Sequence, residues 1–206
     1  DPMAGAASPG LAGTMGLAYR DPRGAMARLL AGGVTDARLL AWLFLACGMG
    51  LAASLPAAVG AARALDIEQP LAGAVSAHIF GYIFIAPLLA YGAAALAHLV
   101  ARPFGARGGF FGARVAVIWS LLLAGPIALL LALARGIGEI ALGGAPVAGD
   151  LPGYAAMAYW MWLFAAGFAE AEGFAGAGRV ALAPLLLFAG LSISLSLLLG
   201  GVAATG

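Results

Sequence analysis

Residues 71–133 decide the fold: LAGAVSAHIFGYIFIAPLLAYGAAALAHLV, then ARPFGARGGFFGAR, then VAVIWSLLLAGPIALLLAL. Two long apolar segments flank a turn that carries three arginines. Either segment is long enough, at about 1.5 Å per residue, to cross a hydrocarbon core of about 30 Å. Backbone groups in lipid find hydrogen-bond partners only within their own helix. The stretch therefore predicts two membrane-spanning helices joined by a short basic turn.

The composition extends this prediction to the whole chain. Of the 206 residues, 64% are hydrophobic and only 9% are charged, whereas about a quarter of the residues in a soluble domain are charged. The mean hydropathy is +1.03. A net charge of +1 excludes a nucleic-acid surface as the main function, because phosphate binding needs an extended basic face. We expect an all-α, polytopic membrane bundle.

Apolar runs separated by charged, Gly-rich or Pro-containing breaks predict five transmembrane helices. Their expected ranges are about 39–62, 71–101, 113–134, 151–169 and 180–202. They belong to one domain, 20–206, preceded by a flexible tail, 1–19, with little apolar area to oppose the entropy of ordering.

A short amphipathic helix is expected over 22–31. Asp21 provides an N-cap, Pro22 occupies the first helical position and Gly32 ends the helix. Its apolar residues recur on one face, opposite Arg23. We expect it to lie at the membrane interface; the alternative is a helix docked on the bundle.

Pro87 and Pro126 lie near the middle of the second and third predicted spans. Each proline removes one helical hydrogen bond and favours a kink. Paired irregular helices can surround a transport site. The alternative is that neighbouring groups satisfy the freed carbonyls of two bent helices.

The arginines are distributed unevenly among the loops. In a five-span topology, one side of the membrane receives the N-terminal arginines, the turn 102–114 and Arg179, and the other receives Arg63 and Arg135. The positive-inside rule then places the N-terminus in the cytoplasm and the C-terminus in the periplasm. The use of arginine without lysine suggests a GC-rich bacterial genome, so the bacterial inner membrane is the expected location.

Five arginines are candidates for binding anionic lipid headgroups, each contributing about 1 kcal/mol near a membrane surface. They are Arg23, Arg28, Arg102, Arg107 and Arg114. The alternative is that these arginines only fix the topology. Glu170 and Glu172, at the end of the fourth span, are expected to be solvated charges.

A second candidate site is intramembrane and polar. Ionisable residues at membrane depth suggest function, here proton relay or solute passage, and hydrogen-bonded structural roles are the alternative. The candidates are His78, Tyr82, Tyr91, His98 and Ser120. The two histidines, twenty residues apart on one helix, cannot share a metal ion. Cys47, the single cysteine, is expected to be a small buried hydrophobe.

The sequence contains no H-E-x-x-H, G-x-S-x-G or Walker motif, and no lysine. We therefore expect a protein that is not an enzyme and that uses no metal or cofactor.

The block FGYIFIAPLLAYGAAALAHLVARPFGARGGFFGARVAVIWSLLLAGPIALLLAL, over 80–133, resembles the Yip1 domain family in its short bacterial form. His98, the turn around Gly105, Trp119 and Pro126 carry the likeness. The resemblance implies five transmembrane helices with a cytoplasmic N-terminus, and no catalytic residues. Eukaryotic members of that family act in vesicle traffic and associate with Rab-type GTPases and with one another.

Together these features predict an inner-membrane protein that organises membrane or assembles with other membrane proteins. Its expected partners are anionic lipids and membrane proteins, including second copies of itself, and not nucleic acid. The alternative is a small transporter or channel with a path between the kinks at Pro87 and Pro126.

Overall fold

In the computed structural model, the described residues are 10–64, 70–142 and 151–176, and all regular structure among them is helical. The elements are α1 (Leu11–Ala18), α2 (Pro22–Ala31), α3 (Asp36–Ala64), α4 (Pro70–Phe80), the π-helical turn η1 (Gly81–Ile85), α5 (Ala86–Ala101), the 3-10 turn η2 (Arg102–Phe104), α6 (Phe110–Ala141) and α7 (Leu151–Glu172). The all-helical prediction is thereby confirmed for the described part of the chain.

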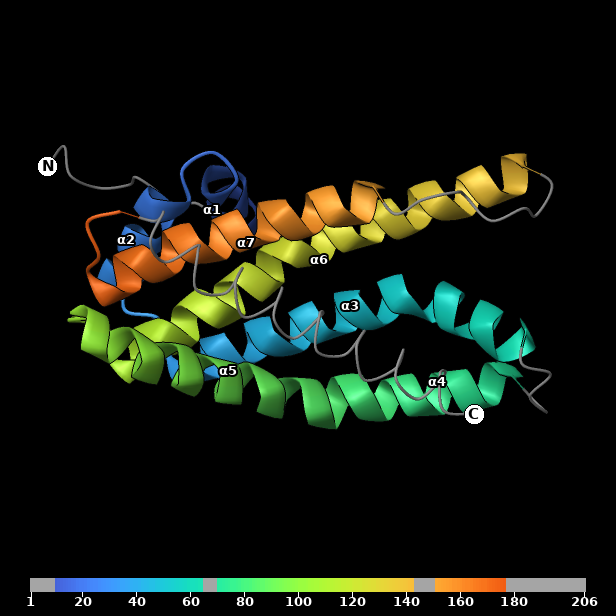
Figure 1. Cartoon of the computed structure of the whole chain (residues 1–206), viewed down its shortest axis with the longest axis horizontal. Helices are drawn as coiled ribbons and strands as arrows, with labels where there is room; N and C mark the ends of the chain where they lie inside the picture. Colours follow the sequence, from blue (N-terminus) through green and yellow to red (C-terminus); the bar gives the residue numbers. More distant parts are fainter. Residues whose placement is uncertain (1–9, 65–69, 143–150, 177–206) are drawn as a thin grey trace, which may run out of the picture.

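Helix α6 is the centre of the bundle. It packs on α3, α5 and α7, and Figure 1 shows it running between α7 on one side and α3 and α5 on the other. Half of the residues in its most apolar window are buried, against 11% for the window within Val75–Phe104. Among the described elements, the rod formed by α4, η1 and α5 is therefore the one that the other long helices cover least.

Three helices of the described chain are long and apolar enough to cross a membrane: Asp36–Gly60, Val75–Phe104 and Phe110–Ala141. They correspond to the first three predicted spans. The fourth predicted span forms a helix, α7 (Leu151–Glu172), but is not among these three. The fifth predicted span, at 180–202, lies outside the described residues.

The N-terminal region differs from the flexible tail that its composition predicts. From Leu11 onward it forms helix α1, and Ala18 is fully buried. The Tyr19 hydroxyl donates a hydrogen bond to the carbonyl of Leu123 in α6 (2.7 Å), and the Tyr159 hydroxyl donates to the carbonyl of Tyr19 (3.0 Å). Contacts with distant residues therefore order a segment whose own composition does not favour a stable structure.

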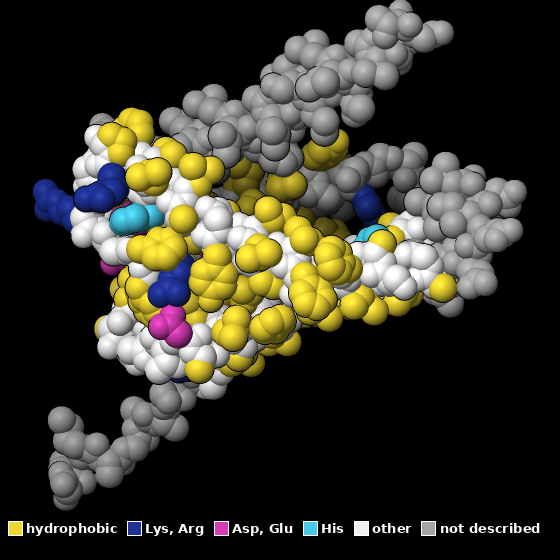
Figure 2. Space-filling view, turned by 90° about the horizontal axis from the view of Figure 1, so that it is seen from below, with side chains coloured by type: hydrophobic (Ala, Val, Ile, Leu, Met, Phe, Trp, Pro, Cys, Tyr) yellow, Lys and Arg dark blue, Asp and Glu magenta, His cyan; other side chains and the backbone are white. Residues whose placement is uncertain are grey.

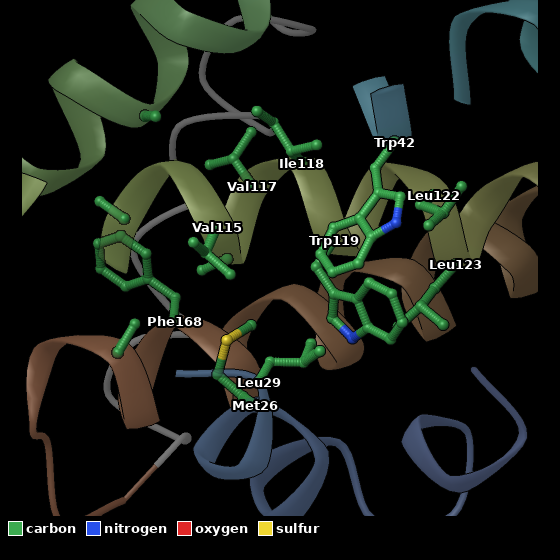
Figure 3. Close-up of a cluster of buried hydrophobic side chains, with 14 of the residues drawn as sticks. Met26, Leu29, Trp42, Val115, Val117, Ile118, Trp119, Leu122, Leu123 and Phe168 are labelled. Carbon is green, nitrogen blue, oxygen red and sulfur yellow. The ribbon is translucent and has the colours of Figure 1, made fainter. Parts of the chain in front are cut away.

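Helix α2 has the predicted bounds. The Asp21 carboxylate accepts a hydrogen bond from the Gly24 N–H (2.9 Å), as expected of an N-cap. Its apolar face packs on α7, with Met26 fully buried, and Figure 3 shows Met26 and Leu29 directed into the core. The apolar face of α2 is therefore docked on the helical bundle, which is the alternative given for this helix above.

The aromatic centre of the core joins α3 to α6. The rings of Trp42 and Trp119 lie 5.1 Å apart, and Figure 3 shows them beside Leu122 and Leu123. All four side chains are buried. This contact holds the first predicted span against the third.

The two mid-helix prolines have different surroundings. The π-helical turn Gly81–Ile85 ends two residues before Pro87, as expected where proline cannot donate the regular helical hydrogen bond. Pro126 lies inside α6, which continues as an α-helix to Ala141. A local irregularity therefore accompanies only the first of the two, and the predicted kinks themselves remain predictions.

Candidate functional site

One end of the bundle carries most of the charged side chains. The hydrophobic surface in Figure 2 extends along the helices, whereas most of the visible arginine and acidic side chains lie toward one end, together with one of the two histidines. This end comprises α2, the start of α3, the turn between α5 and α6, and the end of α7. Because these elements are far apart in sequence, their polar contacts are tertiary. We take this charged end as the candidate site.

The turn between α5 and α6 begins with a Schellman motif. Gly105 has a φ of 91°, which glycine adopts without a Cβ penalty. Its N–H donates to the Arg102 carbonyl (3.1 Å), and the Ala106 N–H donates to the Ala101 carbonyl (3.3 Å). These two bonds satisfy carbonyls at the helix end and reverse the chain.

The second half of the turn rests on the end of α7. The Arg107 N–H donates to the Glu172 carbonyl (2.8 Å). A Cβ atom at Gly108 would meet the carbonyl oxygen of Ala171 and the backbone of Glu172. Only glycine permits so close an approach, so the turn is fixed to α7 by backbone contact.

Beneath the turn, a buried carboxylate pairs with a histidine. Glu172 is fully buried, and its Oε1 lies 2.6 Å from Nδ1 of His98, near the end of α5. Its Oε2 is also buried and has no hydrogen-bond partner among the described groups. The expectation that Glu172 is a solvated charge is therefore wrong.

A signal for this pairing is present in the sequence. An acidic residue in the last turn of a helix is opposed by the helix dipole, and burial of a carboxylate requires a partner. The position of Glu172 in the last helical turn is therefore the signal that could have indicated a nearby cation or donor. It did not indicate His98, which is 74 residues away in the sequence.

Arg23 joins α2 to the end of α7. Its Nη2 lies 3.0 Å from the Glu170 Oε2, and the guanidinium also donates to the carbonyls of Phe174 and Ala175. Both side chains of the pair are about one-third exposed. This candidate headgroup ligand is therefore engaged within the protein, and Glu170 is only partly solvated.

Arg114 is likewise engaged. Its Nη1 lies 3.1 Å from the Asp36 Oδ1 at the start of α3, and its side chain is 20% exposed. The guanidinium also lies over three rings, at 5.1–5.8 Å from their centroids: Tyr91, Phe110 and Phe111. Such cation–π contacts strengthen when partly desolvated. Arg114 thus connects three helices.

The other three candidate arginines are exposed: Arg28, Arg102 and Arg107. Their guanidinium groups make no ion pair or hydrogen bond with another side chain in the part of the chain that the structure describes. Of the five candidate arginines, Arg23 and Arg114 therefore hold helices together. The guanidinium groups of the other three can still donate hydrogen bonds to a ligand.

The candidate intramembrane polar residues do not form one site. The rings of His78 and Tyr82 are stacked, with their centroids 6.4 Å apart. They line a shallow, mainly apolar pocket of about 450 Å³. Tyr91 lies by Arg114, and His98 pairs with Glu172. Ser120 is 2% exposed and donates to the Val117 carbonyl of its own helix (2.8 Å). Only His78 and Tyr82 are brought together.

Metal-binding residues do not cluster in the described chain: no group of three His, Cys, Asp or Glu side chains is close enough to hold an ion. Cys47 is buried and free, as expected.

Comparison with known proteins gave no relative: no family model matches the chain, and no curated protein or solved structure is similar to it. None of these comparisons supports the resemblance to the Yip1 domain family, which rests on the quoted residues alone.

Proposed function

We propose that this chain is a non-enzymatic, multi-pass protein of the bacterial inner membrane that organises membrane or acts as an accessory partner of other membrane proteins. One observation carries the proposal: the polar groups at the charged end connect helices to one another, while the other described helices leave the apolar rod α4–η1–α5 largely uncovered. Arg23–Glu170, His98–Glu172 and Arg114–Asp36 each join two different helices.

The rod supports lateral contact in lipid. Its inner face packs through small buried residues, Ala90, Ala94 and Ala101, which permit close helix approach. Its outer face presents large apolar side chains: Phe80, Phe84, Leu88, Leu89, Leu96 and Leu99. In water such a surface would aggregate, whereas in a bilayer it meets lipid, another membrane protein or a second copy.

The proposed orientation has the charged end in the cytoplasm. Arg23, Arg28, Arg102, Arg107 and Arg114 belong to elements of this end, and excess arginine favours the cytoplasmic side. Five spans, with a periplasmic C-terminus, would then agree with the expectation from the Yip1 family. Labelling of Gly109→Cys, in a Cys47→Ala background, tests the orientation, because a Cβ at Gly109 meets no atom within 4 Å. Labelling only from the periplasmic side would contradict it.

Site-directed crosslinking tests the assembly role. With Cys47 replaced by Ala, Leu88→Cys places a thiol on the exposed face of α5, and Ala94→Cys places one on its buried face. We expect a membrane-permeant bismaleimide to give a discrete crosslinked species for Leu88→Cys in native membranes and none for Ala94→Cys. Mass spectrometry then distinguishes a second copy from another protein.

The absence of a discrete species from Leu88→Cys and from a second exposed site, Leu96→Cys, would overturn the assembly role. Solute flux in proteoliposomes that is abolished by His78→Ala would instead support the transporter alternative.

A further inference from the structure

The turn between α5 and α6 presents two arginines and one ring on its outer side. Arg102, Phe104 and Arg107 are exposed, and Phe104 is 75% exposed. The turn joins two helices that are each long and apolar enough to span a membrane. It therefore lies where the chain leaves the hydrocarbon core, an inference that rests on the proposed membrane function.

The turn is held in place from its inner side. The Schellman bonds at Gly105, the Arg107 N–H bond to Glu172 and the close approach of Gly108 to α7 fix its backbone. A ligand that binds a fixed backbone loses less conformational entropy on association than one that must order a loop. The three outward side chains are thus presented by a preorganised segment.

The local charge favours an anion. The sequence contains no acidic residue between Glu68 and Glu139. The two acids that contact this region from other helices already have partners: Glu172 pairs with His98, and Asp36 pairs with Arg114. The positive charges of Arg102 and Arg107 are therefore not neutralised by side chains of the described chain.

We propose that Arg102 and Arg107, with Phe104 between them, bind the headgroup of an anionic phospholipid in the adjoining leaflet. Guanidinium groups match phosphate oxygens in charge and geometry. An exposed ring beside them suits the boundary between headgroups and acyl chains. Arg23 and Arg114 are excluded from this site because both are engaged in contacts between helices.

Lipid selectivity of the full-length protein tests the proposal. The protein is placed in nanodiscs of phosphatidylcholine with or without phosphatidylglycerol, and the lipids retained after gentle detergent release are counted by native mass spectrometry. For Arg102→Gln/Arg107→Gln we expect the affinity for phosphatidylglycerol to fall about thirty-fold, about five-fold per arginine.

The matched control is Arg20→Gln/Arg38→Gln, which removes the same charge from two exposed positions that are not among the headgroup candidates. It should leave the selectivity for phosphatidylglycerol nearly unchanged, and an equal loss in both variants would overturn a site at the turn. Arg102→Lys/Arg107→Lys keeps the charge and should retain most of the selectivity. Circular dichroism and gel filtration verify that each variant is folded.

Two further outcomes would also overturn the proposal. One is unchanged phosphatidylglycerol retention in a folded Arg102→Gln/Arg107→Gln variant. The other is displacement of the lipid by soluble glycerol phosphate at equal concentration, which would identify a site for free phosphate. Crosslinking through Leu88→Cys is read independently, so failure of lipid binding is distinguishable from failure of the assembly role.

Discussion

Nδ1 of His98 lies 2.6 Å from Oε1 of Glu172, which connects the end of α5 to the end of α7 across the start of α6. Glu172 is fully buried, and its backbone carbonyl also receives the Arg107 N–H. One residue thus holds both a helix end and the basic turn. The candidate lipid site depends on this contact for its shape, although neither His98 nor Glu172 is part of the site.

His98→Ala should destabilise the protein strongly. The substitution leaves the Glu172 carboxylate buried without its partner, and removal of one member of a buried pair costs about 3–5 kcal/mol. Unfolding of the purified protein in mixed micelles, followed by circular dichroism, measures the loss. Glu170→Gln is the control, because the Arg23–Glu170 pair is partly exposed and contributes about 0–1 kcal/mol. Equal effects of the two substitutions would contradict a special role of the buried pair.

Gly108→Ala should displace the basic turn from α7. The added methyl group meets the Ala171 carbonyl and the Glu172 backbone, and such overpacking costs about 1–3 kcal/mol. Gly109→Ala is the matched control, because a Cβ there meets no atom within 4 Å and the backbone has a φ of −102°. Thermal unfolding in nanodiscs compares the two variants. Similar midpoints would refute the close contact between turn and helix.

Met26→Ala should loosen α2 from the bundle. Met26 is fully buried, and truncation of a buried Met costs about 2–5 kcal/mol when the cavity does not collapse. We expect faster trypsin cleavage after Arg28 and a lower unfolding midpoint. Met157→Ala, at a site 37% exposed on α7, should change neither. An unchanged cleavage rate in Met26→Ala would instead favour a helix held by the membrane interface.

Tyr19→Phe should cost about 1 kcal/mol, the typical value of one hydrogen bond, by removing the bond to the Leu123 carbonyl. Burial, and secondarily the neighbouring Tyr159, raises the pKa of the Tyr19 phenol above 10.0. The folded state therefore favours the protonated phenol. This contribution to stability is present below about pH 10 and is lost as the pH rises through the folded-state pKa.

Unfolding measured across the alkaline range checks this dependence. The difference in stability between the native protein and Tyr19→Phe should narrow as the pH rises above 10.0. A constant difference would show that the Tyr19 hydroxyl titrates as it does in the unfolded chain.

The sequence by itself determined the features that depend on neighbouring residues. Apolar length predicted the three long helices, because lipid forces backbone groups to bond within a segment. The Asp21–Pro22 pair predicted where α2 begins. Each of these signals acts over a few residues, so no knowledge of distant partners was needed.

Only the tertiary structure decided which charged side chains are paired within the protein and which remain available to bind a ligand. Arg23 and Arg114 look like Arg102 and Arg107 in the sequence, yet α2 and α3 bring Arg23 to Glu170 and Asp36 to Arg114. The packing of α5 and α7 against α6 likewise buries Glu172 beside His98. The physical reason is that an ion pair forms between groups that packing brings within a few ångströms, and separation along the chain does not predict that distance.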